Sequence, residues 1–514
     1  MNKALLLGAT SIVVAALSFN ATPVFAGPNS CAERVNNTHE KLLECVTIDG
    51  VRRHQAALQA VADANAGIRE TGTSGYDASV MYVVETLEAA GYEPELNGFD
   101  FTYTPPALLR QSAPVIASYE TGAFTGSGYG ALDGSVIGVD LALGGGAWPA
   151  DPNTSTSGCE AADFSGLDFS GPNDIALIQR GACFFSEKAV NAQNAGAEAL
   201  IILNQGNSPS RLGLIVGTAA ALPDGSPSNL LIPVVGASFS QGVALSQVGS
   251  AAYVQVDPPV QTTQYNVIAE LPGKNNDNVV MAGAHLDSVR AGPGIQDNGS
   301  GSAAILETAV QMAKVKPFNT VRFAWWGGEE QGLIGSTAYV NGLTEEQQSD
   351  IALYLNFDMI GSPNHVFFIY DGDDSDGVGA GPGPGGSDQI EYLFESYYMQ
   401  VGQPFKGTDF SGRSDYGPFI AVGIPAGGLF TGAEGIKTPQ EVALWGGVAG
   451  EPYDPCYHLA CDTVDNINLQ ALEINSDAVA YSVLQYGMNT EAVNVERGKG
   501  NFKMPPAEPG PSVE

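Results

Sequence analysis

The sequence predicts an α/β fold, a three-layer sandwich around a mixed, mainly parallel sheet, which an inserted β-rich segment interrupts. Three apolar runs have the length of strands and carry apolar residues on both faces, as strands buried in a parallel sheet do. They are residues 279–284, 320–326 and 351–357. Helical periodicity follows at 302–314 and at 388–400. Between 114 and 256 the pattern changes to short β-like runs rich in Gly, Ser and Pro.

The chain of 514 residues has room for two or three domains. The predicted parts are a signal peptide at 1–26, an N-terminal segment at 27–44, a discontinuous α/β domain at 45–113 and 257–490, the β-rich insertion at 114–256 and a disordered tail at 491–514. The Pro-rich, polar composition of the last residues suggests that disorder.

The N-terminus has the form of a secretory signal. Lys3 supplies a positive charge, and an apolar run follows to Leu17. Val24-Phe25-Ala26 then fits the small-x-small pattern that precedes a signal cleavage site. No later run reaches membrane-spanning length. We therefore expect a secreted or periplasmic protein with no membrane partner.

The net charge of the chain argues against some kinds of binding partner. Asp and Glu number 56 against 21 Lys and Arg, which gives a formal charge of −35. This balance argues against nucleic acid and anionic membrane surfaces as partners. It suits a soluble protein with cationic or neutral ligands, and we expect a monomer.

Export changes how the six cysteines are interpreted, since an oxidising compartment permits disulfide bonds. Sequence alone does not fix their connectivity. Proximity along the chain favours three short bridges, Cys31–Cys45, Cys159–Cys183 and Cys456–Cys461.

The first part of the α/β domain begins with two helices and a strand. Helical periodicity covers 51–66 and 77–90, with Ser74 or Asp77 as the expected cap, and 95–104 alternates as a strand does. Within the insertion, a strand–helix–strand unit is expected over residues 174–204. Each of these predictions rests on local pattern alone.

Polar side chains follow all three buried strands. His285 ends the first, Glu329 and Glu330 follow the second, and Asp358 follows the third. The carboxyl ends of parallel strands share one edge of a sheet, which is where ligands bind in open α/β folds. The loop after the first strand adds Asp297, and His458 comes from later in the chain.

Converged carboxylates repel one another and would not all ionise at neutral pH without a cation. Imidazole and carboxylate together suit zinc. Two histidines and three carboxylates exceed what one catalytic zinc uses but suit two, with Asp297 as a shared ligand. Asp287, two residues after His285, is placed to orient that ligand.

Several motifs resemble peptidase family M28, a family of di-zinc exopeptidases, and in particular its secreted leucine aminopeptidases of actinomycete type. They are residues 285–289, 297–301, 326–336 and 356–361, with 412–419, 423–425, 429–434 and 454–463 near the C-terminus. Residues 175–185, with Lys188 and Asn191, resemble the protease-associated (PA) domain. The resemblance implies the zinc exopeptidase fold with a PA insertion.

Carried over residue by residue, the resemblance implies a complete site. The implied zinc ligands are His285, Asp297, Glu330, Asp358 and His458. Glu329 would be the general base, Tyr457 would stabilise the oxyanion, Asp287 would support His285 and Arg413 would lie in the substrate site. Tyr416 departs from the family, which often has His there, and this puts substrate specificity in doubt.

These observations favour a zinc metalloaminopeptidase that removes large apolar first residues, such as Leu, from peptides with a free N-terminus. One alternative is a metallocarboxypeptidase on the same fold, which would need cationic residues in a chain poor in Arg and Lys. Another is a non-catalytic binding protein, which predicts broken ligands. All the implied ligands are present.

The acidic run at 371–377 suggests Ca²⁺ as a further cofactor. It departs from the EF-hand pattern, because Asp376 stands at the sixth position, where Gly is required, and Pro382 at the twelfth, where Glu is. A solvated acidic loop is the preferred interpretation.

Overall fold

The computed structural model describes residue 31, residues 33–143 and residues 154–504. The predicted signal peptide at 1–26 lies outside the described residues. The chain divides into two compact units, Met1–Phe99 with Thr263–Glu514, and Asp100–Thr262. It passes from one unit to the other within two strands, β1 (Glu95–Tyr103) and β9 (Val260–Leu271).

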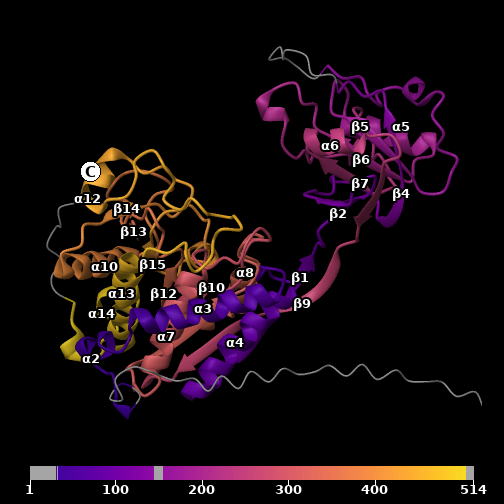
Figure 1. The fold of residues 1–514 in the computed structure, drawn as a ribbon. Coiled ribbons are helices and arrows are strands. Elements are labelled where there is room, and N and C mark those ends of the chain that lie inside the picture. The colour runs from indigo at the N-terminus through magenta and orange to yellow at the C-terminus, as the bar shows by residue number, and fades with distance from the viewer. Residues whose placement is uncertain (1–30, 32, 144–153, 505–514) are drawn as a thin grey trace, which may run out of the picture. The chain divides into compact units, whose positions relative to one another are not determined.

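The larger unit is built on a sheet that has eight strands among the described residues, in the order β1-β9-β11-β10-β12-β15-β13-β14 (Figure 1). Its other strands are β10 (Asn275–His285), β11 (Asn319–Trp326), β12 (Ile351–Phe357), β13 (Phe368–Tyr370), β14 (Lys406–Thr408) and β15 (Ala426–Phe430). The four central strands β11, β10, β12 and β15 are parallel, whereas β9 and β13 pair antiparallel with β11 and β15. The sheet is therefore mixed.

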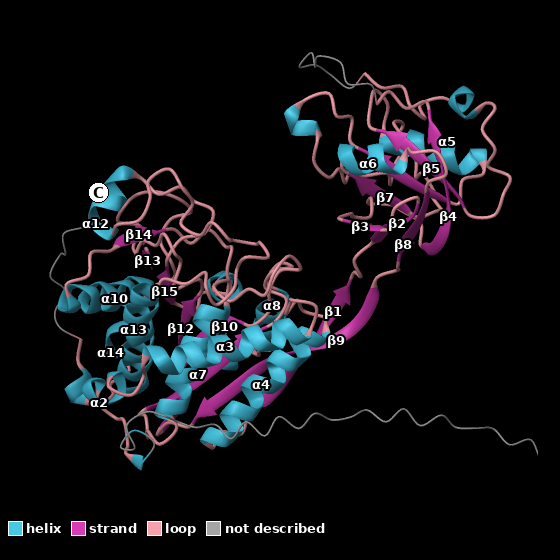
Figure 2. Cartoon of the chain, in the orientation of Figure 1, coloured by secondary structure: helices cyan, strands magenta, loops and turns pink. Residues whose placement is uncertain are grey.

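Alternate residues of the central strands enter two different cores. Val280 and Ala282 of β10 pack in one core, and Val279 and Met281 pack in the other, so both faces of the strand are apolar. The first core also holds residues of α2 (His39–Leu43), α3 (Ile48–Ala64), α4 (Ser74–Ala90), α7 (Gly299–Met312), α10 (Ser387–Val401) and α13 (Leu469–Met488). The second holds residues of α8 (Ile334–Gly342) and α11 (Gly417–Ala421). This confirms the three-layer α/β fold (Figure 2).

Shorter helices complete the larger unit. They are α9 (Glu345–Asp350), α12 (Pro439–Trp445), α14 (Glu491–Asn494) and the 3₁₀ turn Gly500–Phe502. No helix in the described part of the chain is both long and apolar enough to cross a membrane. The six cysteines are paired as Cys31–Cys45, Cys159–Cys183 and Cys456–Cys461.

The smaller unit has its own sheet, with seven strands in the described ranges and the order β3-β2-β8-β4-β5-β6-β7. Its elements are β2 (Leu108–Ala113), β3 (Ala117–Tyr119), β4 (Gly130–Val139), β5 (Asp174–Gln179), α5 (Phe185–Ala195), β6 (Ala199–Leu203), β7 (Val234–Ala237), α6 (Phe239–Leu245) and β8 (Ala251–Val256), with 3₁₀ turns Ala161–Phe164 and Pro209–Arg211. The strand–helix–strand unit expected over 174–204 is β5, α5 and β6.

The insertion is longer than the predicted 114–256, because the smaller unit runs from Asp100 to Thr262. Strand β2, which we assigned to the α/β domain, pairs with β3 and β8 in the smaller unit's sheet. The local sequence of residues 108–113 does not indicate a partner strand, and β8 lies more than a hundred residues further along the chain.

The prediction of a disordered tail from residue 491 is wrong for residues 491–504. Phe502 is buried in the larger core, and its carbonyl accepts hydrogen bonds from the side chains of Gln485, at 2.5 Å, and Asn489, at 3.2 Å. The Asn494 amide also donates to Asn278 at 2.7 Å. A buried aromatic side chain and these hydrogen bonds hold a segment whose composition is otherwise polar. Residues 505–514 lie outside the described residues.

The docked tail predicts a pH-dependent stability. His39 stacks on Tyr481 with ring centroids 4.0 Å apart and meets Phe502 edge-on, and burial lowers its pKa from 6.5 to about 4. Because the unfolded chain binds this proton more readily, stability is lost as pH falls from about 6.5 to about 4, by roughly 3 kcal/mol at most. Above pH 6.5 the ring is neutral in both states.

His39→Phe keeps the ring stack and removes the titration, so its unfolding free energy should depend less on pH over this range. Urea unfolding of both proteins in chelator, at several pH values, measures the difference, because all other groups titrate alike in the two. Equal slopes would contradict the prediction.

Candidate metal centre

The three strand ends meet because β10 lies between β11 and β12 and all three are parallel. His285 is the last residue of β10 and is in register with Trp326, the last residue of β11. Glu329 and Glu330 follow β11 after a turn in which Gly328 has φ +69°, and Asp358 follows β12 directly. The parallel order therefore delivers these side chains to one edge, as predicted.

Asp297 reaches the same edge through the start of α7. Asn298 caps this helix, accepting from the Gly301 N–H, and its amide donates to the Phe357 carbonyl at 2.9 Å. A Cβ at Gly301 would lie 2.0 Å from that same carbonyl oxygen. Only glycine allows this approach, which sets Asp297 beside Asp358.

The cluster has two halves that share Asp297. His285 Nε2 lies 3.2 Å from Asp297 Oδ1 and 3.3 Å from Asp358 Oδ1. His458 Nε2 lies 3.2 Å from Asp297 Oδ2 and 3.0 Å from Glu330 Oε2. Each oxygen of Asp297 thus faces a different pair of one histidine and one carboxylate.

Glu329 lies on the His285 side, with Oε2 3.8 Å from His285 Nε2. The structure therefore separates the adjacent glutamates, because Glu330 contacts His458 and Glu329 does not. The spacing of potential ligand atoms permits a cation among His285, Asp297 and Glu330, and also among His285, Glu329 and Asp358.

Polar groups next to the cluster hold the proposed ligands in their orientations. His285 Nδ1 lies 3.3 Å from the Asp287 carbonyl oxygen and 3.5 Å from its carboxylate. Ser414 Oγ donates to Asp358 Oδ2 at 2.6 Å, which leaves Oδ1 toward His285. Asp462 accepts the backbone N–H groups of Gln296 at 2.8 Å and Asp297 at 3.0 Å.

Protein charges alone do not balance this cluster. Burial raises the pKa of Glu329 well above its usual value and that of Glu330 to about 7. Burial opposes the charge on His458, but Asp297 and Glu330 outweigh it and raise its pKa to about 10. Glu330 Oε1 and Asp358 Oδ1 are buried without a hydrogen-bond partner. Carboxylate oxygens that lack a hydrogen bond and lie beside two imidazoles are suitable ligands for a divalent cation such as zinc.

Tyr457 and His458 lie in a short turn that the Cys456–Cys461 disulfide closes, with Cα atoms 5.3 Å apart. His458 has φ +57°, and its ring stacks on that of Tyr457 with centroids 3.8 Å apart. The bridge therefore brackets both side chains, and this local closure restricts the turn that carries them.

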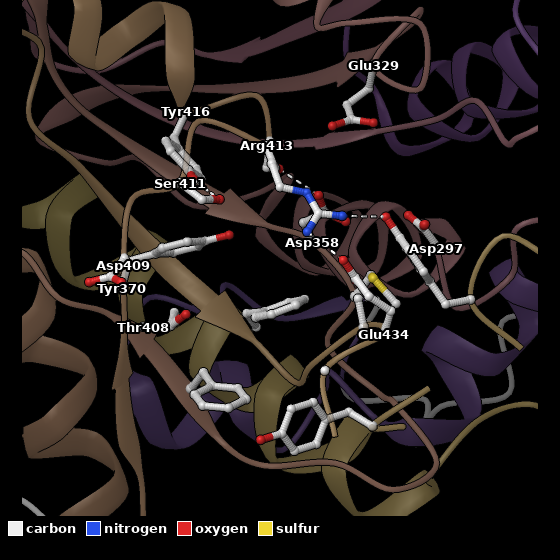
Figure 3. A pocket seen from close by; sticks show the side chains of 18 of the residues that line it. Asp297, Glu329, Asp358, Tyr370, Thr408, Asp409, Ser411, Arg413, Tyr416 and Glu434 are labelled. Atoms are coloured by element: carbon white, nitrogen blue, oxygen red, sulfur yellow. Dashed lines mark hydrogen bonds and ion pairs between the residues drawn. The ribbon is translucent and has the colours of Figure 1, made fainter. Parts of the chain in front are cut away.

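A cavity of about 330 Å³ opens beside the cluster. Asp297, Glu329 and Asp358 lie toward one end of it, and Thr408 and Asp409 toward the other (Figure 3). Its apolar wall is formed by Met359, Phe368, Tyr370, Phe430, Ala433 and Tyr453. The space is therefore acidic where it meets the cluster and has a largely aromatic wall beyond it, with Thr408 and Asp409 at its far end.

Arg413, for which the resemblance implies a place in the substrate site, lines the cavity and is held by Glu434 at 2.7 Å. It also donates to Tyr457 Oη at 3.1 Å. Tyr416 is buried in the wall, where its ring meets Tyr370 with centroids 4.8 Å apart and its hydroxyl accepts from the Gly412 N–H at 2.8 Å. Tyr416 thus helps to shape the cavity wall.

The predicted site residues come together in the structure, but sequence reasoning gave no role to Ser414 and Asp462. Both stand inside motifs that carry the resemblance, and Asp462 directly follows the bridged turn. An acid directly after the cysteine that closes a ligand-bearing turn was the sequence signal that could have found Asp462.

The acidic loop at 371–377 is not simply solvated. Asp371 is buried, and its carboxylate accepts the backbone N–H groups of Ser375 at 3.1 Å and Asp376 at 3.2 Å. Glu391 Oε2 accepts from the Gly372 N–H at 2.8 Å. By accepting backbone N–H groups, the carboxylates of Asp371 and Glu391 stabilise the conformation of the loop.

Comparison with known proteins agrees with this geometry. The model of peptidase family M28 matches residues 266–483, and that of the PA domain matches residues 144–245. An aminopeptidase of Pseudomonas aeruginosa is 46% identical over 511 residues, covering 95% of this chain and 92% of the relative. A probable lipoprotein aminopeptidase of Mycobacterium tuberculosis is 39% identical, covering 95% and 94%.

Solved structures resemble the chain over most of its length. An aminopeptidase from Aneurinibacillus sp. strain AM-1 has a TM-score of 0.50 and 27% identity, covering 87% of this chain and 96% of its own. A zinc aminopeptidase from Bacillus subtilis has a TM-score of 0.56 at 24% identity, covering 86% and 95%, which supports the fold alone. The chain belongs to peptidase family M28 and carries an inserted PA domain.

Proposed function

We propose that this protein is an exported zinc aminopeptidase with two zinc ions per chain. His285 and Asp358 would hold one ion, His458 and Glu330 the other, and Asp297 both. The observation that carries the proposal is the Asp297 carboxylate, whose two oxygens face two different histidine–carboxylate pairs at 3.2 Å each. Each ion would then have three protein ligands, the number that catalytic zinc sites use.

Bound zinc would supply Lewis acidity toward the scissile carbonyl and lower the pKa of water. The remaining work falls to the chain's own residues. Glu329 is largely buried and lies at the cluster without contacting His458. It can take a proton from the attacking water and pass it to the leaving amine. Its separation from Glu330 supports this division of roles.

Tyr457 is the proposed donor to the developing oxyanion. Burial raises its pKa above the ordinary value, so the phenol keeps its proton at neutral pH. Because Arg413 already donates to the phenol oxygen, the Tyr457 O–H has to point to another acceptor. A preorganised donor of this kind stabilises negative charge in the transition state.

Substrate choice follows from the cavity. Its acidic end offers Glu329 and Asp358 to a free α-ammonium group, and its aromatic wall suits a large apolar first side chain such as Leu. A carboxypeptidase would need a cationic side chain to bind the C-terminal carboxylate of its substrate. Arg413 lines the cavity and carries such a charge. Its ion pair with Glu434 at 2.7 Å already compensates that charge, which favours the aminopeptidase.

An oxidising compartment is consistent with the disulfide pairing of all six cysteines. Together with the signal-like N-terminus, this supports export to the periplasm or the medium. We infer that the protein works there on peptides with a free N-terminus, as a monomer.

The proposal predicts hydrolysis of an unblocked Leu-anilide that stops when a chelator removes the metal and returns with zinc. Release of the chromophore measures it. The matched substrate is N-acetyl-Leu-anilide, which lacks the ammonium group and should not be cleaved. Cleavage of a C-terminal residue from N-blocked peptides, with no release from free Leu-anilide, would favour the carboxypeptidase instead.

A further inference from the structure

A buried arginine holds the turn between two of the proposed ligands. Arg69 has no exposed surface, and its guanidinium donates to the carbonyls of Leu286, Pro293, at 2.8 Å, and Gly294, at 2.6 Å. These carbonyls lie between His285 and Asp297. The backbone of Arg69 also exchanges hydrogen bonds with Ser288, at 2.9 and 3.3 Å.

The contacts of Arg69 suit a supporting role. Among the described residues no carboxylate lies within ion-pair distance of its guanidinium, although Asp287, Asp462, Asp297 and Glu330 all act on its charge from further away. Burial lowers its pKa only to about 10, so it stays charged at neutral pH. A direct ion pair would occupy ligand oxygens, whereas bonds to carbonyls leave them available.

The next two residues hold neighbouring parts of the site. Thr71 is fully buried, and its Oγ1 accepts the N–H of Gly328 at 2.8 Å, directly before Glu329 and Glu330. Glu70 forms a two-bond ion pair with Arg290, at 2.8 Å for each bond, in the same turn that Arg69 holds. One short segment therefore touches both ligand-bearing turns.

We propose that Arg69, Glu70 and Thr71 form a positioning clamp that joins the His285–Asp297 turn to the Gly328–Glu330 turn and so sets the spacing of the metal ligands. Arg69 and Thr71 are its positioning residues. The inference rests on the proposed zinc centre. It extends that proposal by adding a segment that is far from the ligands in sequence and supports them.

The clamp should influence metal affinity as well as folding. The turn from Leu286 to Gln296 has no regular secondary structure, so its buried carbonyls depend on outside donors. Without the guanidinium fork the carbonyls of Leu286 and Pro293 would lose their partner, and that of Gly294 would keep only the Gly299 N–H. The turn would then relax away from the geometry that His285 and Asp297 need. The positive charge also offsets repulsion among the nearby carboxylates.

Arg69→Lys keeps the charge and loses the planar fork, which a single ammonium does not replace. We expect its zinc affinity, measured by chelator competition, to fall by about 10–100-fold, the effect usual for groups that support metal ligands. The matched control is Arg322→Lys, since Arg322 is a largely buried arginine paired with Glu270 and Tyr339. Its zinc affinity should stay close to the wild-type value.

Thr71 provides a second, independent test of the clamp. Thr71→Val removes the acceptor for the Gly328 N–H and should weaken zinc binding by about tenfold or more, whereas Thr71→Ser keeps the hydroxyl and should restore it. Thermal unfolding of the zinc-free proteins separates the two roles, because a merely structural residue would lower the melting temperature without changing the zinc affinity.

If wild-type protein binds zinc while Arg69→Lys and Thr71→Val bind it equally well, the clamp is overturned and the proposed function stands. If wild-type protein binds no zinc, both fail.

Discussion

Glu329→Gln is expected to keep both zinc ions and the fold, and to lose about 10²–10⁴-fold in kcat, the usual contribution of a positioned proton-transfer group. Gln is nearly isosteric with Glu and still forms hydrogen bonds, so substrate should still bind, with KM raised only by the loss of one of the two carboxylates offered to the α-ammonium group. The reason lies in the geometry, because Glu329 stands 3.8 Å from His285 Nε2 while Glu330 contacts His458 at 3.0 Å. Metal analysis and steady-state kinetics on Leu-anilide check it.

Glu330→Ala is the matched comparison, since it changes the adjacent residue of the same turn. It should lower zinc affinity and activity together, because it removes a proposed ligand. Zinc loss in Glu329→Gln, together with full zinc content in Glu330→Ala, would reverse the assignment of the two glutamates.

The sequence predicted the ligand-bearing edge because its cause is local. Each buried strand is recognisable from its own apolar run, and parallel neighbours must end at one edge. Nothing local brings His458 to that edge; it entered the predicted site as the second histidine, and the resemblance to the family then implied it as a ligand. The place of Asp297 beside Asp358 depends on Gly301 and Asn298, whose contacts with β12 become visible only in three dimensions.

The remaining features depend on distant partners. Strand β2 is short and has no clear local pattern, and its pairing with β3 and β8 is what assigns it to the smaller unit. The segment to residue 504 has a composition that suggests disorder, yet the buried Phe502 side chain and hydrogen bonds to distant side chains hold it on the core. Arg69 has no sequence signal at all, since an arginine in a loop is usually exposed, and its three carbonyl partners lie more than two hundred residues further along the chain.

Asp297→Asn is expected to lower the zinc content from two ions per chain to one or none and to abolish measurable hydrolysis. Asn has almost the shape of Asp, but one of its two terminal atoms is an NH₂ donor that does not bind a cation. Because Asp297 Oδ1 and Oδ2 face His285 and His458 separately, either orientation of the amide spoils one half of the site. The lost negative charge weakens binding in the other half too.

Elemental analysis after equilibration with zinc measures the stoichiometry, and Leu-anilide hydrolysis measures the activity. The control is Asp371→Asn, which changes another buried aspartate, one whose carboxylate accepts backbone N–H groups in the acidic loop. That variant should keep two zinc ions. Two zinc ions in Asp297→Asn would remove the shared carboxylate from the proposal, since the two halves would then bind metal independently. One zinc ion with full activity would show that a single half of the site performs the chemistry.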